Sequence, residues 1–316
     1  MEGARTDEER EWAREGLRQA EDDCLSELRT RVLGLSQQMV EDRAPRGTIG
    51  PDILQLPPGR AEALATAADT VAALNPPTTF AAHFIQGNAF YAAGEFEKAL
   101  AAYNHALALR PDHPDALNNR AVTLDDLKRY EEALVDCNRA LEFRPDDPMI
   151  LNNRGNALIH LKRYEEALAD CDRSLELRPD HPHTLNNRAN ALFRLGRHKE
   201  ALADYNRALE LRPDHPAILY NRGVTLAGLG RYEEALADYN RSLELTPDDP
   251  DTLYNRACLL SLMQKWGESL ADLRAAVAID PDNQRLARED EHFEGLRNDP
   301  EWGPRFWEIV GREDKP

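Results

Sequence analysis

Residues 148–181 read PMILNNRGNALIHLKRYEEALADCDRSLELRPDH, and this stretch decides the fold. Apolar residues at three- and four-residue spacing predict one helix in its first half and a second helix in its latter half. A short basic turn, Lys162-Arg163, separates the two helices, and Pro179 ends the second because proline cannot continue a helix. The next helix is expected to begin at Pro182, behind Asp180 and His181 as candidate caps.

The same pattern recurs along the chain with a period of 34 residues. Each copy carries a Pro-Asp pair near its end, and these pairs begin at Pro111, Pro145, Pro179, Pro213, Pro247 and Pro281. Alignment on the pairs gives six units, which are 80–113, 114–147, 148–181, 182–215, 216–249 and 250–283. Because one helix hairpin cannot bury its apolar face alone, the pattern predicts an all-α array in which each hairpin stacks on the next.

Two columns of small residues mark where helices are expected to approach closely. The column on the first helices consists of Gly87, Ala121, Gly155, Ala189, Gly223 and Ala257. The column on the second helices consists of Ala99, Ala133, Ala167, Ala201 and Ala235, with Ser269 as the exception. Cys137 and Cys171 stand in a column that elsewhere holds Tyr103, Tyr205 and Tyr239, and we therefore interpret them as core residues.

This pattern resembles the tetratricopeptide repeat family over about two-thirds of the chain. The match is to a small residue, then Ala-x-x-x-aromatic, then proline, as in Ala201, Tyr205 and Pro213. The resemblance implies an α-solenoid, a right-handed superhelix of helix hairpins. It also implies that the first helix of each hairpin lines a concave groove that binds a protein or peptide.

The chain departs from the family in two columns of the first helix. The usual Trp is replaced by Leu117, Leu151, Leu185, Leu219 and Leu253, and the usual Leu by Arg120, Arg154, Arg188, Arg222 and Arg256. A column of arginines needs partners, and the candidates are Asp136, Asp170, Asp204, Asp238 and Asp272. The first unit has Gln86 and Ala102 at these positions, so both members are absent together. We predict that Arg154 pairs with Asp170 or with an aspartate of an adjacent unit.

Polar residues that recur on the groove-lining helices are the candidate binding residues. Asparagine recurs without a break at Asn119, Asn153, Asn187, Asn221 and Asn255, and Asn156 and Asn190 lie one turn further on. Tyr220, Tyr254 and Phe193 could form side-chain pockets on the same face. Because an amide carries two donor hydrogens and an acceptor, such a ladder could hold the backbone of an extended peptide. The alternative is that the amides hydrogen-bond within the array.

The charge and the cysteines restrict the partners and the compartment. The net charge is −18, which disfavours nucleic acid and favours a neutral or basic protein segment as ligand. Neither a membrane segment nor the apolar core of a signal peptide is present in the sequence. Cys24, Cys137, Cys171 and Cys258 form no close pair, so neither a disulfide framework nor a zinc site is predicted. A cytoplasmic location is expected.

No pattern in the sequence indicates catalysis. A Gly-rich phosphate loop, a nucleophile elbow and a Ser/His/Asp set are all missing. Histidines 113, 181 and 215 recur at the repeat period and are not spaced as metal ligands. We therefore expect no enzyme activity, no cofactor and no metal.

The ends of the chain are expected to differ from the repeats. Residues 1–42 contain an amphipathic helix over 7–42, whose apolar stripe docks on the repeats or pairs with another copy of the chain. Residues 43–59 are a Pro/Gly-rich linker, and residues 60–79 form a degenerate half-repeat helix. Residues 284–316 are predicted to form two short capping helices with apolar stripes at Leu286, Phe293 and Leu296 and at Trp302, Phe306, Trp307 and Val310.

The leading functional hypothesis is a non-catalytic scaffold or adaptor that binds an extended peptide or protein segment along the groove. One alternative is a structural protein that assembles into homo-oligomers through residues 7–42. Another is a regulatory subunit of a separate enzyme, which is compatible with either.

Overall fold

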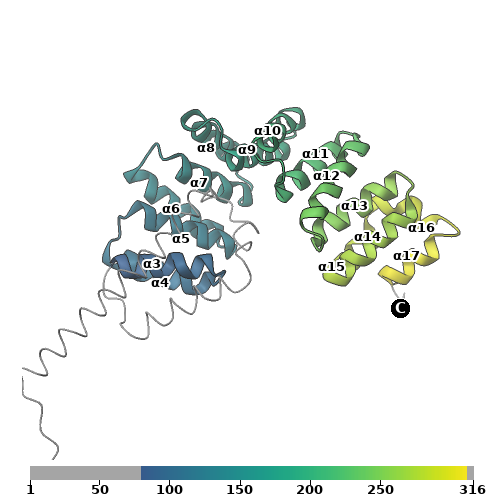
Figure 1. Cartoon of the computed structure of the whole chain (residues 1–316), viewed down its shortest axis with the longest axis horizontal. Helices are drawn as coiled ribbons and strands as arrows, with labels where there is room; N and C mark the ends of the chain where they lie inside the picture. The colour runs from purple at the N-terminus through teal and green to yellow at the C-terminus, as the bar shows by residue number, and fades with distance from the viewer. Residues whose placement is uncertain (1–79, 312–316) are drawn as a thin grey trace, which may run out of the picture. The chain divides into compact units, whose positions relative to one another are not determined.

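The computed structural model describes residues 80–311, which form α-helices, one short 3-10 helix and no strand. The helix expected over 7–42, the linker at 43–59 and the half-repeat helix at 60–79 lie outside the described residues. The predicted all-α array of helix hairpins is confirmed for residues 80–283 (Figure 1).

Twelve helices form the six predicted hairpins. They are α3 (Phe80–Ala92) with α4 (Phe96–Leu109), α5 (Pro114–Asp126) with α6 (Tyr130–Phe143), α7 (Pro148–His160) with α8 (Tyr164–Leu177), α9 (Pro182–Arg194) with α10 (His198–Leu211), α11 (Pro216–Gly228) with α12 (Tyr232–Leu245), and α13 (Pro250–Leu262) with α14 (Trp266–Ile279).

The chain divides into two compact units between Phe143 and Arg144. In the first unit α3 packs on α4, α4 on α5 and α5 on α6. In the second unit the helices pack in the same consecutive way from α7 to α14, and α9 also contacts α7 and α11, while α11 contacts α13. Within the second unit the first helices of the hairpins therefore form one continuous layer.

Proline and short polar caps set where the first helices begin. Five of them have proline in the first turn, where the missing N–H would have no helical partner. Asp147 accepts hydrogen bonds from the backbone N–H groups of Met149 and Ile150, and Asp249 accepts one from Thr252. His181 occupies the same capping position before α9, but its side chain makes no capping hydrogen bond.

The turn inside each hairpin requires a left-handed backbone conformation. The residues with this conformation are Gly94, Lys128, Lys162, Gly196, Gly230 and Gln264, all with φ between 58° and 75°. Glycine adopts it without strain, whereas the two lysines and the glutamine do so at a cost of about 1 kcal/mol each. The turn thus keeps the same backbone conformation in all six hairpins, although the residue type at this position varies.

Small residues and aromatic rings fill the core of each hairpin. Ala99, Ala133, Ala167, Ala201 and Ala235 are at most 1% exposed, as their column predicted. Tyr103, Tyr205 and Tyr239 are at most 2% exposed, and Cys137 and Cys171 are free and fully buried in the same column. The interpretation of these two cysteines as core residues is confirmed.

The predicted pairing of the arginine and aspartate columns is also confirmed, within each hairpin. Arg154 donates two hydrogen bonds to Asp170, at 2.6 and 2.5 Å, through Nε and Nη2. The same bidentate contact joins Arg120 to Asp136, Arg188 to Asp204, Arg222 to Asp238 and Arg256 to Asp272. All five aspartates are buried, so each carboxylate depends on its arginine for a charged partner.

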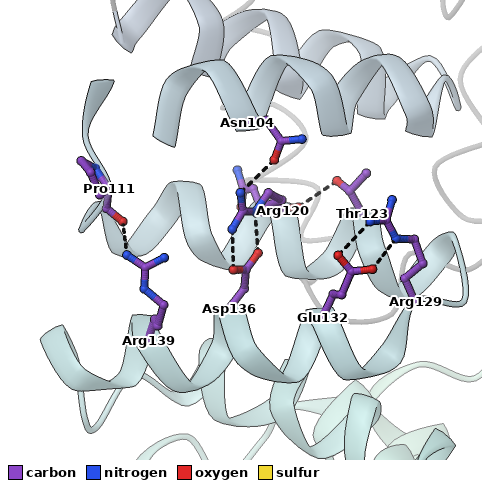
Figure 2. Close-up of polar contacts among 9 residues, drawn as sticks. Asn104, Pro111, Arg120, Thr123, Arg129, Glu132, Asp136 and Arg139 are labelled. Atoms are coloured by element: carbon purple, nitrogen blue, oxygen red, sulfur yellow. Dashed lines mark hydrogen bonds and ion pairs between the residues drawn. The ribbon is translucent and has the colours of Figure 1, made fainter. Parts of the chain in front are cut away.

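In Arg120, Arg188, Arg222 and Arg256 the remaining guanidinium nitrogen reaches the preceding hairpin. Figure 2 shows Arg120 on α5 between Asp136 on α6 and Asn104 on α4, to whose Oδ1 it donates at 2.8 Å. The equivalent bonds run from Arg188 to Asp172, from Arg222 to Asn206 and from Arg256 to Asn240. Each of these arginines therefore links three helices of two neighbouring repeats.

The C-terminal segment covers the last hairpin. It consists of α15 (Asp282–Glu289), a 3-10 helix η2 (Glu291–Phe293), α16 (Glu294–Asn298) and α17 (Gly303–Val310), rather than two short helices. Phe293, Leu296, Phe306 and Val310 are fully buried against Ala257 and Leu273. Leu286, which was placed in the predicted stripe, is 46% exposed, because α15 turns that side chain to the surface.

The core column predicts a position-specific response to added volume. Ala167→Leu should lower the free energy of unfolding by about 1–3 kcal/mol, because the larger side chain overpacks the contact between α7 and α8. Ala169, which is exposed on the same helix, supplies the matched control Ala169→Leu. Urea denaturation of both variants checks the expectation, and equal midpoints would contradict it.

The arginine column predicts a large difference between buried and exposed ion pairs. Arg222→Met should lower the free energy of unfolding by about 2–4 kcal/mol, because it leaves the buried carboxylate of Asp238 without a cation. In the matched control Arg231→Met, the lost partner Glu234 is solvent-exposed, and stability should hardly change. Chemical denaturation of the two variants makes the comparison, and similar losses in both would refute it.

Candidate functional site

The candidate binding residues lie on the first helices of the hairpins, as predicted. Within the second unit, α7, α9, α11 and α13 present them in one layer, which we call the first-helix face. Asn119 lies on α5 of the first unit. The face is therefore described separately in each unit.

The asparagine ladder joins neighbouring repeats. The amide Nδ2 of Asn187 donates to Oδ1 of Asn152 at 3.1 Å, and that of Asn221 donates to Oδ1 of Asn186 at 3.1 Å. In the first unit Asn119 donates to Asn88 at 2.9 Å. Asn119, Asn187 and Asn221 thus each reach an acceptor on the first helix of the preceding repeat.

Doublets in the sequence supply both partners of these bonds. Asn152-Asn153 and Asn186-Asn187 each provide an acceptor for the following repeat and a member of the ladder itself. The next doublet is Tyr220-Asn221, and there Asn255 donates to the hydroxyl oxygen of Tyr220 at 3.0 Å. The acceptor role of Asn152, Asn186 and Tyr220 was not predicted, although the doublets are visible in the sequence.

Burial divides the ladder into two groups. Asn153 and Asn187 are 6% and 0% exposed, so a ligand has no access to these two amides in this structure. The burial of these two amides agrees with the alternative interpretation, in which the amides hydrogen-bond within the array. Asn119, Asn156, Asn190, Asn221 and Asn255 are partly exposed.

The three aromatic candidates, Tyr220, Tyr254 and Phe193, are partly exposed, and each also contacts other residues of the structure. Phe193 packs against the core of the second unit, and Tyr220 packs near the ring of Tyr239 with centroids 6.2 Å apart. The hydroxyl of Tyr254 donates to Oδ2 of Asp290 at 2.8 Å. These contacts hold the three side chains in place, and part of each side chain remains exposed at the surface.

The environment of Tyr220 and Asn255 is acidic. Burial, followed by the charges of Asp251 and Asp249, raises the pKa of Tyr220 to about 12. Burial, Asp249 and Asp280 also raise the pKa of Asp251 itself. This end of the first-helix face therefore carries a negative potential that favours a cationic or neutral ligand.

Three histidines cluster where the hairpins of α9 and α11 begin. The ring of His183 lies 5.9 Å from that of His181 and 5.2 Å from that of His215. Arg212 approaches Nε2 of His183 at 3.3 Å, and Nδ1 of His181 contacts Oγ1 of Thr184 at 2.7 Å. Burial, followed by the charges of Arg178 and Arg212, lowers the pKa of His181 to about 4.

A mixed group of polar side chains lies where η2 meets α13. Cys258, Asp290 and His292 place their potential ligand atoms within 4.8 Å of one another. This group was not predicted from the sequence, because Cys258 is far from the other two residues along the chain and a single Asp-x-His pair carries no specific signal.

The burial of His181 predicts a pH-dependent stability. The neutral imidazole is favoured in the folded chain, whereas the unfolded chain binds its proton near pH 6.5. The unfolded state therefore binds more protons between pH 6.5 and 4, and stability falls as the pH decreases through this window, by at most about 3 kcal/mol.

The variant His181→Asn isolates this contribution, because asparagine caps a helix and does not titrate. Denaturation curves between pH 7 and 4 should show a smaller loss of stability in the variant than in the unchanged chain. Parallel pH dependences of the two proteins would show that another group is responsible.

None of the helices in residues 80–311 is long and apolar enough to cross a membrane. A search of curated proteins finds no significant match. Among solved structures, the chain is similar to the hetero-tetramer Cut9–Hcn1 of the APC/C, with a TM-score of 0.66 and 16% identity over 73% of this chain. The match spans 46% of that relative, so it concerns less than half of its length.

Two further structures are similar over most of their own length. A tetratricopeptide repeat protein from Parabacteroides merdae matches with a TM-score of 0.60 and 19% identity, covering 82% of this chain and 96% of that one. A thermophilic protein of the same type from Thermus thermophilus matches with a TM-score of 0.51 and 26% identity, covering 58% and 99%.

Sequence models described as tetratricopeptide repeats match most of the array. The matched ranges are 59–114, 85–148 and 186–250 for one model, 146–214 for a second and 238–271 for a third. Together they extend over residues 59–271, which is more than half of the 316 residues. The chain belongs to the tetratricopeptide repeat family, whose all-α solenoids serve in protein–protein interaction.

Proposed function

We propose that the chain is a non-catalytic scaffold that holds an extended segment of a partner protein on the first-helix face. The observation that carries this proposal is the group of partly exposed residues on the adjacent helices α11 and α13. These residues are Tyr220, Asn221, Tyr254 and Asn255. They combine aromatic edges with amides, a combination suited to gripping a peptide backbone without strong sequence selection.

The binding role is confined to the exposed part of the ladder. Asn187 is fully buried and joins α9 to Asn152 on α7, and Asn153 is buried beside Asn152 on α7. Asn221 donates one amide hydrogen to Asn186 of the preceding repeat and has a second donor hydrogen. Asn255 donates to the hydroxyl of Tyr220 and to the backbone oxygen of Asp251, so it offers a ligand its amide oxygen rather than its hydrogens. The buried amides thus support the exposed ones.

The ligand is a basic or neutral segment. Asp249, Asp251 and Asp280 surround this part of the face, and the whole chain carries a net charge of −18. Arg194 also acts on Tyr220, but its effect is smaller than that of Asp251 and Asp249, so an acidic tail would face net repulsion here. Assembly through residues 7–42 is a separate hypothesis, which concerns residues outside those described.

Binding is tested with an array of extended peptides of equal length and of basic, neutral or acidic composition. The basic and neutral peptides should bind, and the affinity of the basic ones should fall as salt is added. For the tightest binder, the double variant Asn221→Ala/Asn255→Ala should lose about tenfold in affinity, since each lost contact costs about 0.5–1.5 kcal/mol.

The matched control is Asn298→Ala, which removes an exposed amide at the end of α16. It should bind like the unchanged chain, and circular dichroism should show that all variants keep their helicity. The proposal fails if acidic peptides bind best, or if the double variant and the control bind alike.

A further inference from the structure

The last repeat and the C-terminal segment bring together three side chains that commonly ligate metals. Sγ of Cys258 lies 3.6 Å from Oδ2 of Asp290, and Nδ1 of His292 lies 2.6 Å from Oδ1 of the same carboxylate. Cys258 comes from α13, whereas Asp290 and His292 come from the start of η2. The group therefore spans the joint between the array and its cap.

Cys258 differs from the other two cysteines of the described residues. Cys137 and Cys171 replace a core tyrosine and are fully buried. Cys258 instead occupies a position on the first helix that holds Asn88, Val122, Asn156, Asn190 and Val224 in the other repeats. It is 7% exposed, and a carboxylate and an imidazole lie beside it. Cys258 also packs in the hydrophobic core with Ala257 and Leu273, but core filling does not account for the carboxylate and the imidazole beside its thiol.

We propose that Cys258, Asp290 and His292 form a site for a zinc ion. Thiolate, imidazole and carboxylate are all ligands that zinc takes in proteins, and three protein ligands leave a fourth position open to water or to a further ligand. Tetrahedral coordination with bonds of about 2.0–2.3 Å separates neighbouring ligand atoms by about 3.3–3.5 Å. The sulfur-to-oxygen distance of 3.6 Å is within about 0.1 Å of this range.

The imidazole has the freedom that the site still needs. His292 must move away from Asp290 by several tenths of an ångström, and its side chain is 45% exposed, so nothing in the core opposes the movement. The hydroxyl of Tyr254 donates to Asp290 at 2.8 Å and orients the carboxylate, as outer-shell partners do in zinc sites. Loading the site releases the thiol proton of Cys258 to the buffer.

A zinc ion at this place fastens the cap to the last repeat. η2 contacts α13 mainly through this group and through Phe293, whose ring lies 6.0 Å from that of Tyr254. The ion adds a cross-link between two segments that are otherwise joined by packing and hydrogen bonds. Tyr254 belongs both to this group and to the first-helix face, but metal binding can be measured without a peptide.

The test uses the full chain after removal of metal with a chelator. Titration with Co²⁺, which substitutes for zinc, should give one tetrahedral site per chain with a thiolate-to-cobalt charge-transfer band, and Zn²⁺ should abolish that band by displacement. Cys258→Ser should remove the band, and His292→Ala should weaken binding roughly tenfold or more. Zn²⁺ should raise the melting temperature of the unchanged chain but not that of Cys258→Ser.

Two control variants each remove a residue of the same type, a cysteine or a histidine, that lies outside the proposed site. Cys171→Ala removes a buried core thiol, and His160→Ala removes an exposed imidazole on α7, and both should keep the charge-transfer band. His292 is at the surface, so its variant tests the site without threatening the fold. The proposal is overturned if the unchanged chain gives no charge-transfer band, or if the band survives in Cys258→Ser or is undiminished in His292→Ala.

Discussion

The structure depends on one electrostatic constraint, a buried carboxylate in the second helix of each of five hairpins. A buried charge is stable only with a partner of opposite charge and good geometry, and here an arginine of the first helix supplies two parallel hydrogen bonds to it. The pair fixes the distance and the register of the two helices. Since the third nitrogen of the guanidinium reaches the preceding hairpin in four of the five cases, the same constraint also sets how repeats meet.

The first-helix face follows from that constraint. Once the arginines hold the helices in register, Asn187 lies within hydrogen-bonding distance of Asn152, and Asn255 lies within reach of Tyr220. The asparagine ladder therefore connects neighbouring repeats in addition to the arginines, and only its exposed members are available to a ligand. What remains accessible at α11 and α13 is an acidic, aromatic and amide-rich area whose geometry the buried contacts preorganise.

The sequence predicts much of this fold because a 34-residue period repeats each signal six times. The Pro-Asp pairs place the helix ends, and the joint absence of both members in the first unit, at Gln86 and Ala102, identifies the arginine and aspartate columns as partners. Single occurrences carry no such signal. The exposure of Leu286 and the meeting of Cys258 with Asp290 depend on how one irregular segment folds back, which no period encodes. The burial of Asn153 and Asn187 could not be predicted either, because recurrence of a residue type in the sequence does not show how deeply the side chain is buried.

The central claim is that the arginines bound to these buried aspartates couple neighbouring repeats as well as the two helices of one hairpin. Amide hydrogen exchange of the full chain, followed by mass spectrometry, tests it in Arg188→Met. That substitution removes the contacts to Asp204 on α10 and to Asp172 on α8. Protection should fall in α9 and α10 and also in α8, while α3 and α4 stay unchanged, since repeat arrays are coupled by nearest neighbours. A loss confined to α9 and α10, or no loss at all, would contradict the claim.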